Sequence, residues 1–189
     1  MGADTCHFAG VFRPTTYLPM PTTIPDIQLD AGYYPCPCPC SLFTANHPCT
    51  LSTETAASDR DQVACRTRPF YNISTTSKSV YADPKDAQAS VDKIKVLDAH
   101  PGVFVCMAHD HALFDVLPMY NSQPNKYIND WQELDYKKKT QWAFLNELPK
   151  GSGPGRDILV PGLRRTGNTT MEWHDGEGFV LVSQTPGFQ

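Results

Sequence analysis

Residues 83–111 read DPKDAQASVDKIKVLDAHPGVFVCMAHDH, and this stretch decides the fold. Asp83 is a favoured N-cap residue, and Pro84 suits the first position of a helix. One face of this stretch is formed by residues at helical spacing, and they are Ala87, Val91, Ile94 and Leu97 or Asp98. The sequence His100-Pro101-Gly102 then ends the pattern. We predict an amphipathic helix over about residues 84–98.

A continuous apolar run follows this helix. Val103-Phe104-Val105-Cys106-Met107 contains β-branched residues after a glycine, which predicts a strand buried on both faces. A helix that leads into a buried strand is typical of α/β proteins. Ala108-His109-Asp110-His111 comes next, at the end of a strand where open α/β sheets place their sites. These polar residues are either metal ligands or a hydrogen-bonded structural turn.

Further towards the C-terminus, a second helix is expected over about residues 130–147. One face carries a lysine that contributes its aliphatic stem, and the face comprises Trp131, Leu134, Lys138, Trp142 and Leu145. We therefore expect a helix–strand–helix core over residues 81–150 and short strands with a tail over 151–189. The expected strands are Ile158-Leu159-Val160 and Phe179-Val180-Leu181-Val182.

The first half of the chain is rich in proline. Many of the 17 prolines lie there, and proline lacks the backbone N–H that a helix or a central strand needs. Residues 13–46 are therefore predicted to form an extended surface insertion. The whole of residues 13–80 is expected to be loop-rich.

Composition excludes several classes of protein. The 189 residues suit one domain, and 40% hydrophobic and 19% charged residues with a net charge of −4 fit neither a disordered chain nor a basic nucleic-acid binder. No apolar run approaches the roughly 20 residues of a membrane helix, and the N-terminus lacks a signal-peptide apolar region. We expect a cytoplasmic protein with no nucleic-acid or membrane partner.

Seven cysteines, an odd number, argue against a complete disulfide framework. Three of them alternate with prolines in Cys36-Pro37-Cys38-Pro39-Cys40, and Cys49 and Cys65 follow. Thiolates bind zinc well, although structural sites favour pairs of cysteines that are two to four residues apart. Cys36, Cys38 and Cys40 are thus either the ligands of a small zinc-binding module or thiols of a loop in a reducing compartment.

Three motifs together resemble the metallo-β-lactamase-fold hydrolases, and most of all their lactonase branch, which includes fungal members. The motifs are Gly-x-Asp-x-x-His at Gly2–His7, the helix segment Ser90–Lys95, and the strand with its following residues at Val103–Asp110. The resemblance covers about residues 1–10 and 80–150. It implies an α/β fold, the C-terminal half of an αββα sandwich with a Pro/Cys-rich loop insertion, in a single partial domain over residues 1–189.

The resemblance also implies a site. Asp4 matches the aspartate that bridges two zinc ions, and His109 matches a histidine that binds one of them. His7 stands where many lactonases carry a tyrosine that polarises the substrate carbonyl, so it is either a catalytic donor or acid, or a core histidine. Asp110 either orients His109 through a hydrogen bond or is an exposed turn carboxylate.

One departure from the family is large. The family signature His-x-His-x-Asp-His is missing, so Asp4 and His109 do not complete a zinc pair. We expect a C-terminal portion of a metal-dependent hydrolase of a cyclic ester or amide, a lactone or lactam, that is inactive alone. The alternative from another class is a non-catalytic remnant or partner-binding protein that keeps part of the fold.

Overall fold

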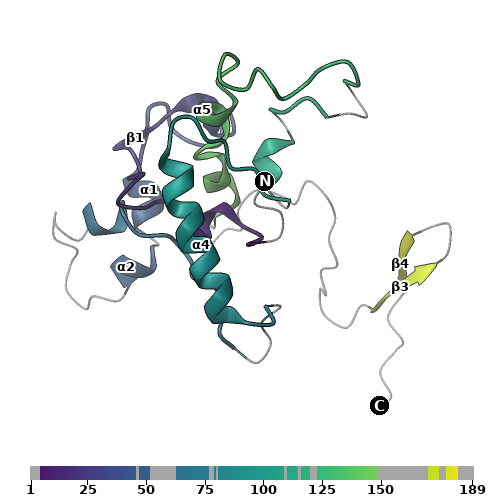
Figure 1. The fold of residues 1–189 in the computed structure, drawn as a ribbon. Helices are drawn as coiled ribbons and strands as arrows, with labels where there is room; N and C mark the ends of the chain where they lie inside the picture. Colours follow the sequence, from purple (N-terminus) through teal and green to yellow (C-terminus); the bar gives the residue numbers. More distant parts are fainter. Residues whose placement is uncertain are drawn as a thin grey trace. The chain divides into compact units, whose positions relative to one another are not determined.

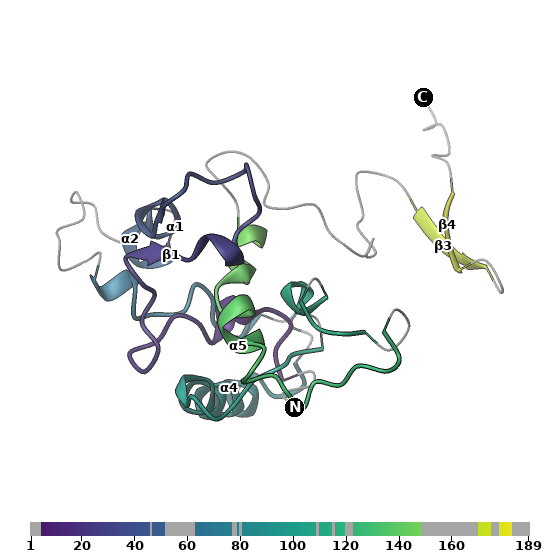
Figure 2. The same ribbon diagram turned by 90° about the horizontal axis from the view of Figure 1, so that it is seen from above.

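The computed structural model describes residues 5–45, 47–51, 63–76, 79, 81–108, 110–114, 116–119, 123–148, 170–174 and 178–182. It divides into two compact units, Met1–Arg156 and Asp157–Gln189 (Figures 1 and 2). No helix within the described ranges is long and apolar enough to cross a membrane.

The predicted first helix is confirmed as α4, Pro84–Ala99, drawn in teal in Figure 1. The Asp83 carboxylate accepts the backbone N–H groups of Lys85 and Asp86 at 2.9 and 3.0 Å, which satisfies two of the donors that a helix start leaves unpaired. Val91, Ile94 and Asp98 are buried along one face. Local capping and spacing signals therefore placed this helix correctly.

Short elements precede α4. The two-residue strands β1, Thr23–Ile24, and β2, Cys38–Pro39, pair antiparallel with Thr23 opposite Pro39 and Ile24 opposite Cys38. This region also contains the 3-10 turns η1, Ala9–Val11, and η2, Asp26–Gln28, and the short helices α1, Ser41–Thr44, and α2, Pro48–Leu51.

The prediction of a surface insertion over residues 13–46 is wrong, because this region supplies much of the core. Its buried side chains, with others nearby in sequence, are Phe12, Met20, Ile24, Cys38, Phe43, Phe70 and Ile73. Side chains form hydrogen bonds with backbone groups that lie outside regular elements. For example, Arg66 Nε donates to the Met20 carbonyl at 2.7 Å. Proline prevents regular elements without keeping its neighbours out of the core, so periodicity alone could not detect this packing.

The predicted strand at residues 103–107 is also not formed, since residues 103–106 lie in no strand. Val105 and Met107 are buried, as the apolar run suggested. The Val103 carbonyl, however, accepts a hydrogen bond from Lys137 Nζ at 2.7 Å. An apolar run indicates burial but does not identify a backbone partner, and a strand needs one.

The second helix is shorter than expected. α5 spans Tyr136–Thr140 and η4, a 3-10 helix, spans Ala143–Glu147, both in green in Figure 2, whereas residues 129–135 form turns. Asp135, directly before α5, has a φ of 54°, a left-handed conformation that interrupts a helix. Trp142 and Leu145 are buried as predicted, but Lys138 is exposed and its neighbour Lys137 is buried instead.

The second unit contains a hairpin of β3, Thr170–His174, and β4, Gly178–Val182. The strands pair antiparallel, with Thr170 opposite Val182 and His174 opposite Gly178. β4 confirms the strand predicted at Phe179–Val182, whereas β3 was not predicted from the sequence. The strand predicted at residues 158–160 lies outside the described residues.

A buried ion pair joins distant parts of the first unit. Arg13, 2% exposed, donates from Nε and Nη2 to the two carboxylate oxygens of Asp98, 1% exposed, both at 2.6 Å. Its Nη1 donates to the Gln141 carbonyl at 2.9 Å. The start of the chain, α4 and the residue after α5 are thereby held together.

Candidate functional site

Of the four predicted site residues, Asp4 and His109 lie outside the described residues, and His7 and Asp110 lie within them. Two described residues that follow Asp4 in sequence lie near residues on either side of His109. Thr5 lines a pocket of about 240 Å³ together with Val103, Phe104 and Val105. The thiol of Cys6 is also within electrostatic reach of Asp110. The fold thus brings the segment after Asp4 near residues 103–105 and Asp110.

His7 is exposed, which excludes the alternative that it is a core histidine. Its ring lies beside Tyr81, with 6.1 Å between the ring centroids and 34° between the planes. Burial raises the pKa of Tyr81, and a hydrogen bond with the His7 backbone lowers it in part. Tyr81 is therefore a protonated phenol next to His7 at neutral pH.

Asp110 is buried, with 6% of its surface exposed, so it is not an exposed turn carboxylate. Its Oδ1 accepts the Ala112 backbone N–H at 3.2 Å at the start of η3, His111–Leu113. The charge of Asp110 also acts on Arg13, whose pKa it helps to raise. The carboxylate is thus held in place, and an interaction with His109 stays a prediction.

Two cysteines accompany these residues, and neither is ionised at neutral pH. Burial is the largest cause that raises the pKa of Cys6 to about 11, and it also raises the pKa of Cys106. Asp110 raises both further. A neutral thiol is a weak nucleophile, so neither cysteine is poised to attack a substrate.

Tyr81 is a neighbour that sequence reasoning did not find. It lies two residues before the N-cap Asp83, and no spacing or motif marked it. Its approach to His7 across more than seventy residues of chain depends on tertiary packing. Only its position just before a well-predicted helix start provided a signal.

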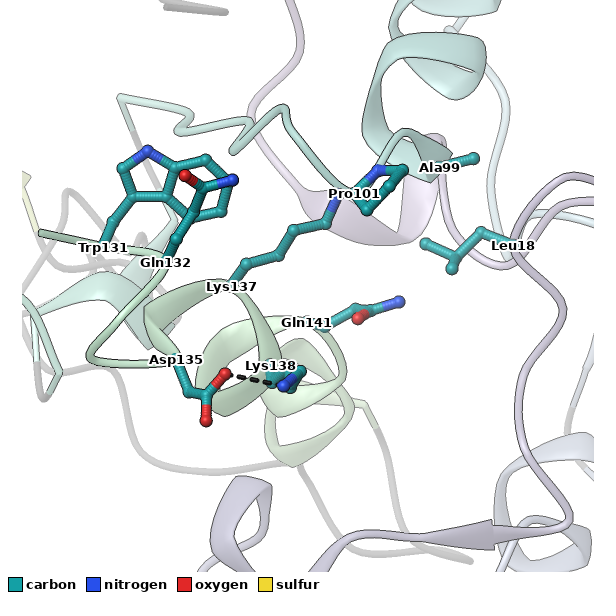
Figure 3. Close-up of a pocket in the computed structure, with 9 residues that line it drawn as sticks. All are labelled: Leu18, Ala99, Pro101, Trp131, Gln132, Asp135, Lys137, Lys138 and Gln141. Atoms are coloured by element: carbon teal, nitrogen blue, oxygen red, sulfur yellow. Dashed lines mark ion pairs between the residues drawn. The ribbon is translucent and has the colours of Figure 1, made fainter.

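A separate pocket of about 370 Å³ contains neither His7 nor Asp110 among its lining residues (Figure 3). Its lining residues are Leu18, Ala99, Pro101, Trp131, Gln132, Asp135, Lys137, Lys138 and Gln141. Lys138 pairs with Asp135 at 2.7 Å, the dashed line in Figure 3. The Lys137 ammonium already donates to the carbonyls of Asp98, His100 and Val103. Both lysines of this pocket are thus engaged within the protein.

The cysteines of the proline-rich segment do not gather as a zinc-binding trio. Cys36 is exposed and its Sγ donates to Asp26 Oδ2 at 2.8 Å, whereas Cys38 is buried in β2. Within the described ranges, the potential ligand atoms that do lie together belong to His47, Cys49 and Cys65, all within 4.8 Å of one another. Cys49 and Cys65 follow the trio in sequence, and no motif joins them to His47.

The chain is similar in sequence to two named hydrolases. No protein-family model matches the chain, and no solved structure matches it. The metallo-hydrolase mfmC of Annulohypoxylon moriforme is 32% identical over 148 residues, which are 78% of this chain and 32% of that protein. The γ-lactamase FDB1 of Fusarium pseudograminearum is 30% identical over 148 residues, 78% of this chain and 31% of that protein.

A third relative has a different name. The cytochrome P450 monooxygenase mpaDE' of Penicillium brevicompactum is 34% identical over 148 residues, 78% of this chain but 12% of that protein. Because so small a part is matched, its name does not define the activity of the matched segment. The chain spans about a third of the length of the other two relatives.

These matches confirm the resemblance to metal-dependent hydrolases. Over most of its length the chain belongs to the family that contains the metallo-hydrolase mfmC and the γ-lactamase FDB1. Such relatives also imply an α/β fold class. The described residues contribute helices and two two-stranded sheets to it.

Proposed function

We propose that this chain forms part of the metal site of a hydrolase that opens a cyclic amide or ester. The observation that carries the proposal is the homology to a metallo-hydrolase and a γ-lactamase over 148 residues. Two observations support it: Thr5 lines the same pocket as residues 103–105, and the charge of Asp110 acts on the Cys6 thiol.

The donor groups of this region fit zinc. Asp4 and His109 would hold the metal, with Asp4 bridging two ions, and carboxylate and imidazole are common ligands of zinc. When bound, zinc supplies Lewis-acid polarisation of a carbonyl and lowers the pKa of a water molecule.

The remaining residues would protonate the substrate or hold the catalytic side chains in place. His7 is exposed, so its imidazole is accessible to a substrate and would donate a hydrogen bond to the carbonyl oxygen or a proton to the leaving nitrogen or oxygen. Tyr81 would fix the orientation of His7 through the ring contact and the backbone hydrogen bond. Asp110 would accept a hydrogen bond from His109 and thereby set which ring nitrogen faces the metal.

A hybrid enzyme tests the substrate class. In this hybrid, the present chain replaces the segment that it matches in the γ-lactamase FDB1. We expect the hybrid to hydrolyse a γ-lactam or a γ-lactone, and to act more slowly on the open-chain amide and ester of the same atoms. The native γ-lactamase, purified in parallel, serves as the reference for both rates.

The opposite result is equally clear. A hybrid that is folded by circular dichroism but hydrolyses neither ring would contradict the proposal. It would favour the non-catalytic, partner-binding alternative. Hydrolysis of only the lactone or only the lactam would define the ester or amide preference of the site.

A further inference from the structure

A second set of potential metal ligands lies in the proline-rich half of the chain. His47 is 1% exposed and immediately precedes α2, Cys49 is half-buried within α2, and Cys65 is fully buried. One ligand atom from each lies within 4.8 Å of the other two. The three residues come from two segments that are separated by the chain between residues 49 and 65. Cys65 is thus brought to His47 and Cys49 by the fold and not by closeness in sequence.

The protonation state of His47 is fixed by its hydrogen bonds. The Cys49 backbone N–H donates to Nδ1 at 3.0 Å, so Nδ1 carries the lone pair. Nε2 therefore carries the proton and donates it to the Arg68 carbonyl at 3.0 Å. Histidines that bind metals commonly donate their second ring N–H to a carbonyl in this way. A metal would take the Nδ1 lone pair in place of the Cys49 N–H.

The surroundings hold the imidazole in place. Its ring packs against Phe70 with 4.5 Å between centroids, and Phe70 in turn packs against Phe144 in the core. The imidazole is thus packed against the hydrophobic core.

The spacing suits a tetrahedral metal after a small contraction. With Zn–S near 2.3 Å and Zn–N near 2.0–2.1 Å, a tetrahedral zinc holds two sulfurs about 3.8 Å apart and a sulfur and a nitrogen about 3.6 Å apart. The present separations of up to 4.8 Å exceed these values by roughly 1 Å. Rotation of the cysteine side chains supplies movements of this size.

We propose that His47, Cys49 and Cys65 form a binding site for zinc or another thiophilic divalent cation. Each thiol releases its proton to water as its sulfur binds the metal. The fourth position is left to water, because His47 and Cys49 also line a pocket of about 360 Å³. The bound metal would link α2 to the segment that carries Cys65.

This site is independent of the proposed catalytic metal. It uses thiolates, whereas the proposed hydrolytic site uses carboxylate and imidazole. The two sites can therefore be distinguished by spectroscopy and by separate variants. Failure of one proposal leaves the other standing.

Cobalt binding to the full chain under reducing conditions tests the site. Co²⁺ bound by thiolates shows a sulfur-to-metal charge-transfer band that oxygen and nitrogen ligands do not give, and zinc should abolish the band by competition. We expect one Co²⁺ per chain with this band, and affinity at least about 100-fold weaker in Cys49→Ser and in Cys65→Ser. Cys36→Ser is the matched control, because Cys36 is exposed and bonded to Asp26, and its affinity should be unchanged.

A labelling experiment needs no variant and guards against misfolding of Cys65→Ser. Zinc should slow alkylation of the half-buried Cys49 by iodoacetamide, located by mass spectrometry, and leave the alkylation rate of Cys36 unchanged. The absence of a thiolate band together with an unprotected Cys49 would overturn the proposal. A spontaneous Cys49–Cys65 disulfide in the purified, unreduced chain, with no metal bound after reduction, would also overturn it.

Discussion

At the scale of single residues, the Arg13–Asp98 pair is the strongest polar feature of the first unit. Both side chains are almost completely buried, and two hydrogen bonds of 2.6 Å join them. Removing water from two charges is costly, so such a pair contributes little net stability, but loss of one partner leaves the other charge buried and uncompensated. The pair therefore fixes how α4 packs on the N-terminal segment.

Asp98→Asn should destabilise the protein strongly. The substitution keeps the shape of the side chain and removes the charge that compensates Arg13, so we expect the free energy of unfolding to fall by about 3–5 kcal/mol. Asp92→Asn on the same helix is the matched control, because Asp92 pairs with Lys95 near the surface and should cost less than about 1 kcal/mol. Urea denaturation followed by circular dichroism measures both. Equal losses would refute the role assigned to the pair.

Two adjacent lysines provide a second comparison. Lys137 is buried and its ammonium donates to three carbonyls at 2.5–2.7 Å, whereas Lys138 is 78% exposed. Lys137→Met leaves those carbonyls without their donor, and we expect a loss of about 1–3 kcal/mol in the free energy of unfolding. Lys138→Met should change it by less than about 0.5 kcal/mol. A larger effect at Lys138 than at Lys137 in thermal denaturation would contradict this assignment.

The residues of the proposed site were found by resemblance, whereas their environment was not predictable. The motifs marked His7 and Asp110, and the structure adds that His7 is exposed and Asp110 buried. Tyr81 and the pairing of Arg13 with Asp98, 85 residues apart, carry no local signal. The approach of distant polar groups is decided by tertiary packing, which a single sequence does not specify.

At the scale of elements, prediction succeeded where the signal was local. α4 has an N-cap, a proline at its first position and a clear stop, and its bounds were predicted within one residue. The region of residues 130–147 had a helical spacing of apolar residues but no cap, and Asp135 breaks it. The run at residues 103–107 is buried as expected, yet pairing is a non-local property and no strand forms over residues 103–106.

The N-cap of α4 can be tested directly. Asp83→Ala removes the acceptor of the Lys85 and Asp86 N–H groups, and we expect a loss of about 1 kcal/mol in the free energy of unfolding. Asp83→Asn keeps an acceptor oxygen and should lose less than half of that. Equilibrium denaturation measures both variants. An alanine variant as stable as the asparagine variant would show that the cap does not stabilise the helix.

At the scale of the whole molecule, the irregular half and the helical half share one core. Met20, Ile24 and Phe43 pack in the same cluster as Val91 of α4 and Leu145 of η4. Within this unit the segment after Asp4 lies beside residues 103–105. Homology to the metallo-hydrolase mfmC and the γ-lactamase FDB1 covers 148 residues, 78% of the chain.

The most direct test of the central claim removes the proposed metal ligands one at a time. In the hybrid γ-lactamase, the account predicts that Asp4→Ala and His109→Ala each lower kcat/KM for ring hydrolysis by more than about 100-fold and reduce bound zinc. The matched controls Asp130→Ala and His100→Ala, both at exposed positions, should leave activity and zinc content unchanged. Full activity and full zinc content in both ligand variants would contradict the account.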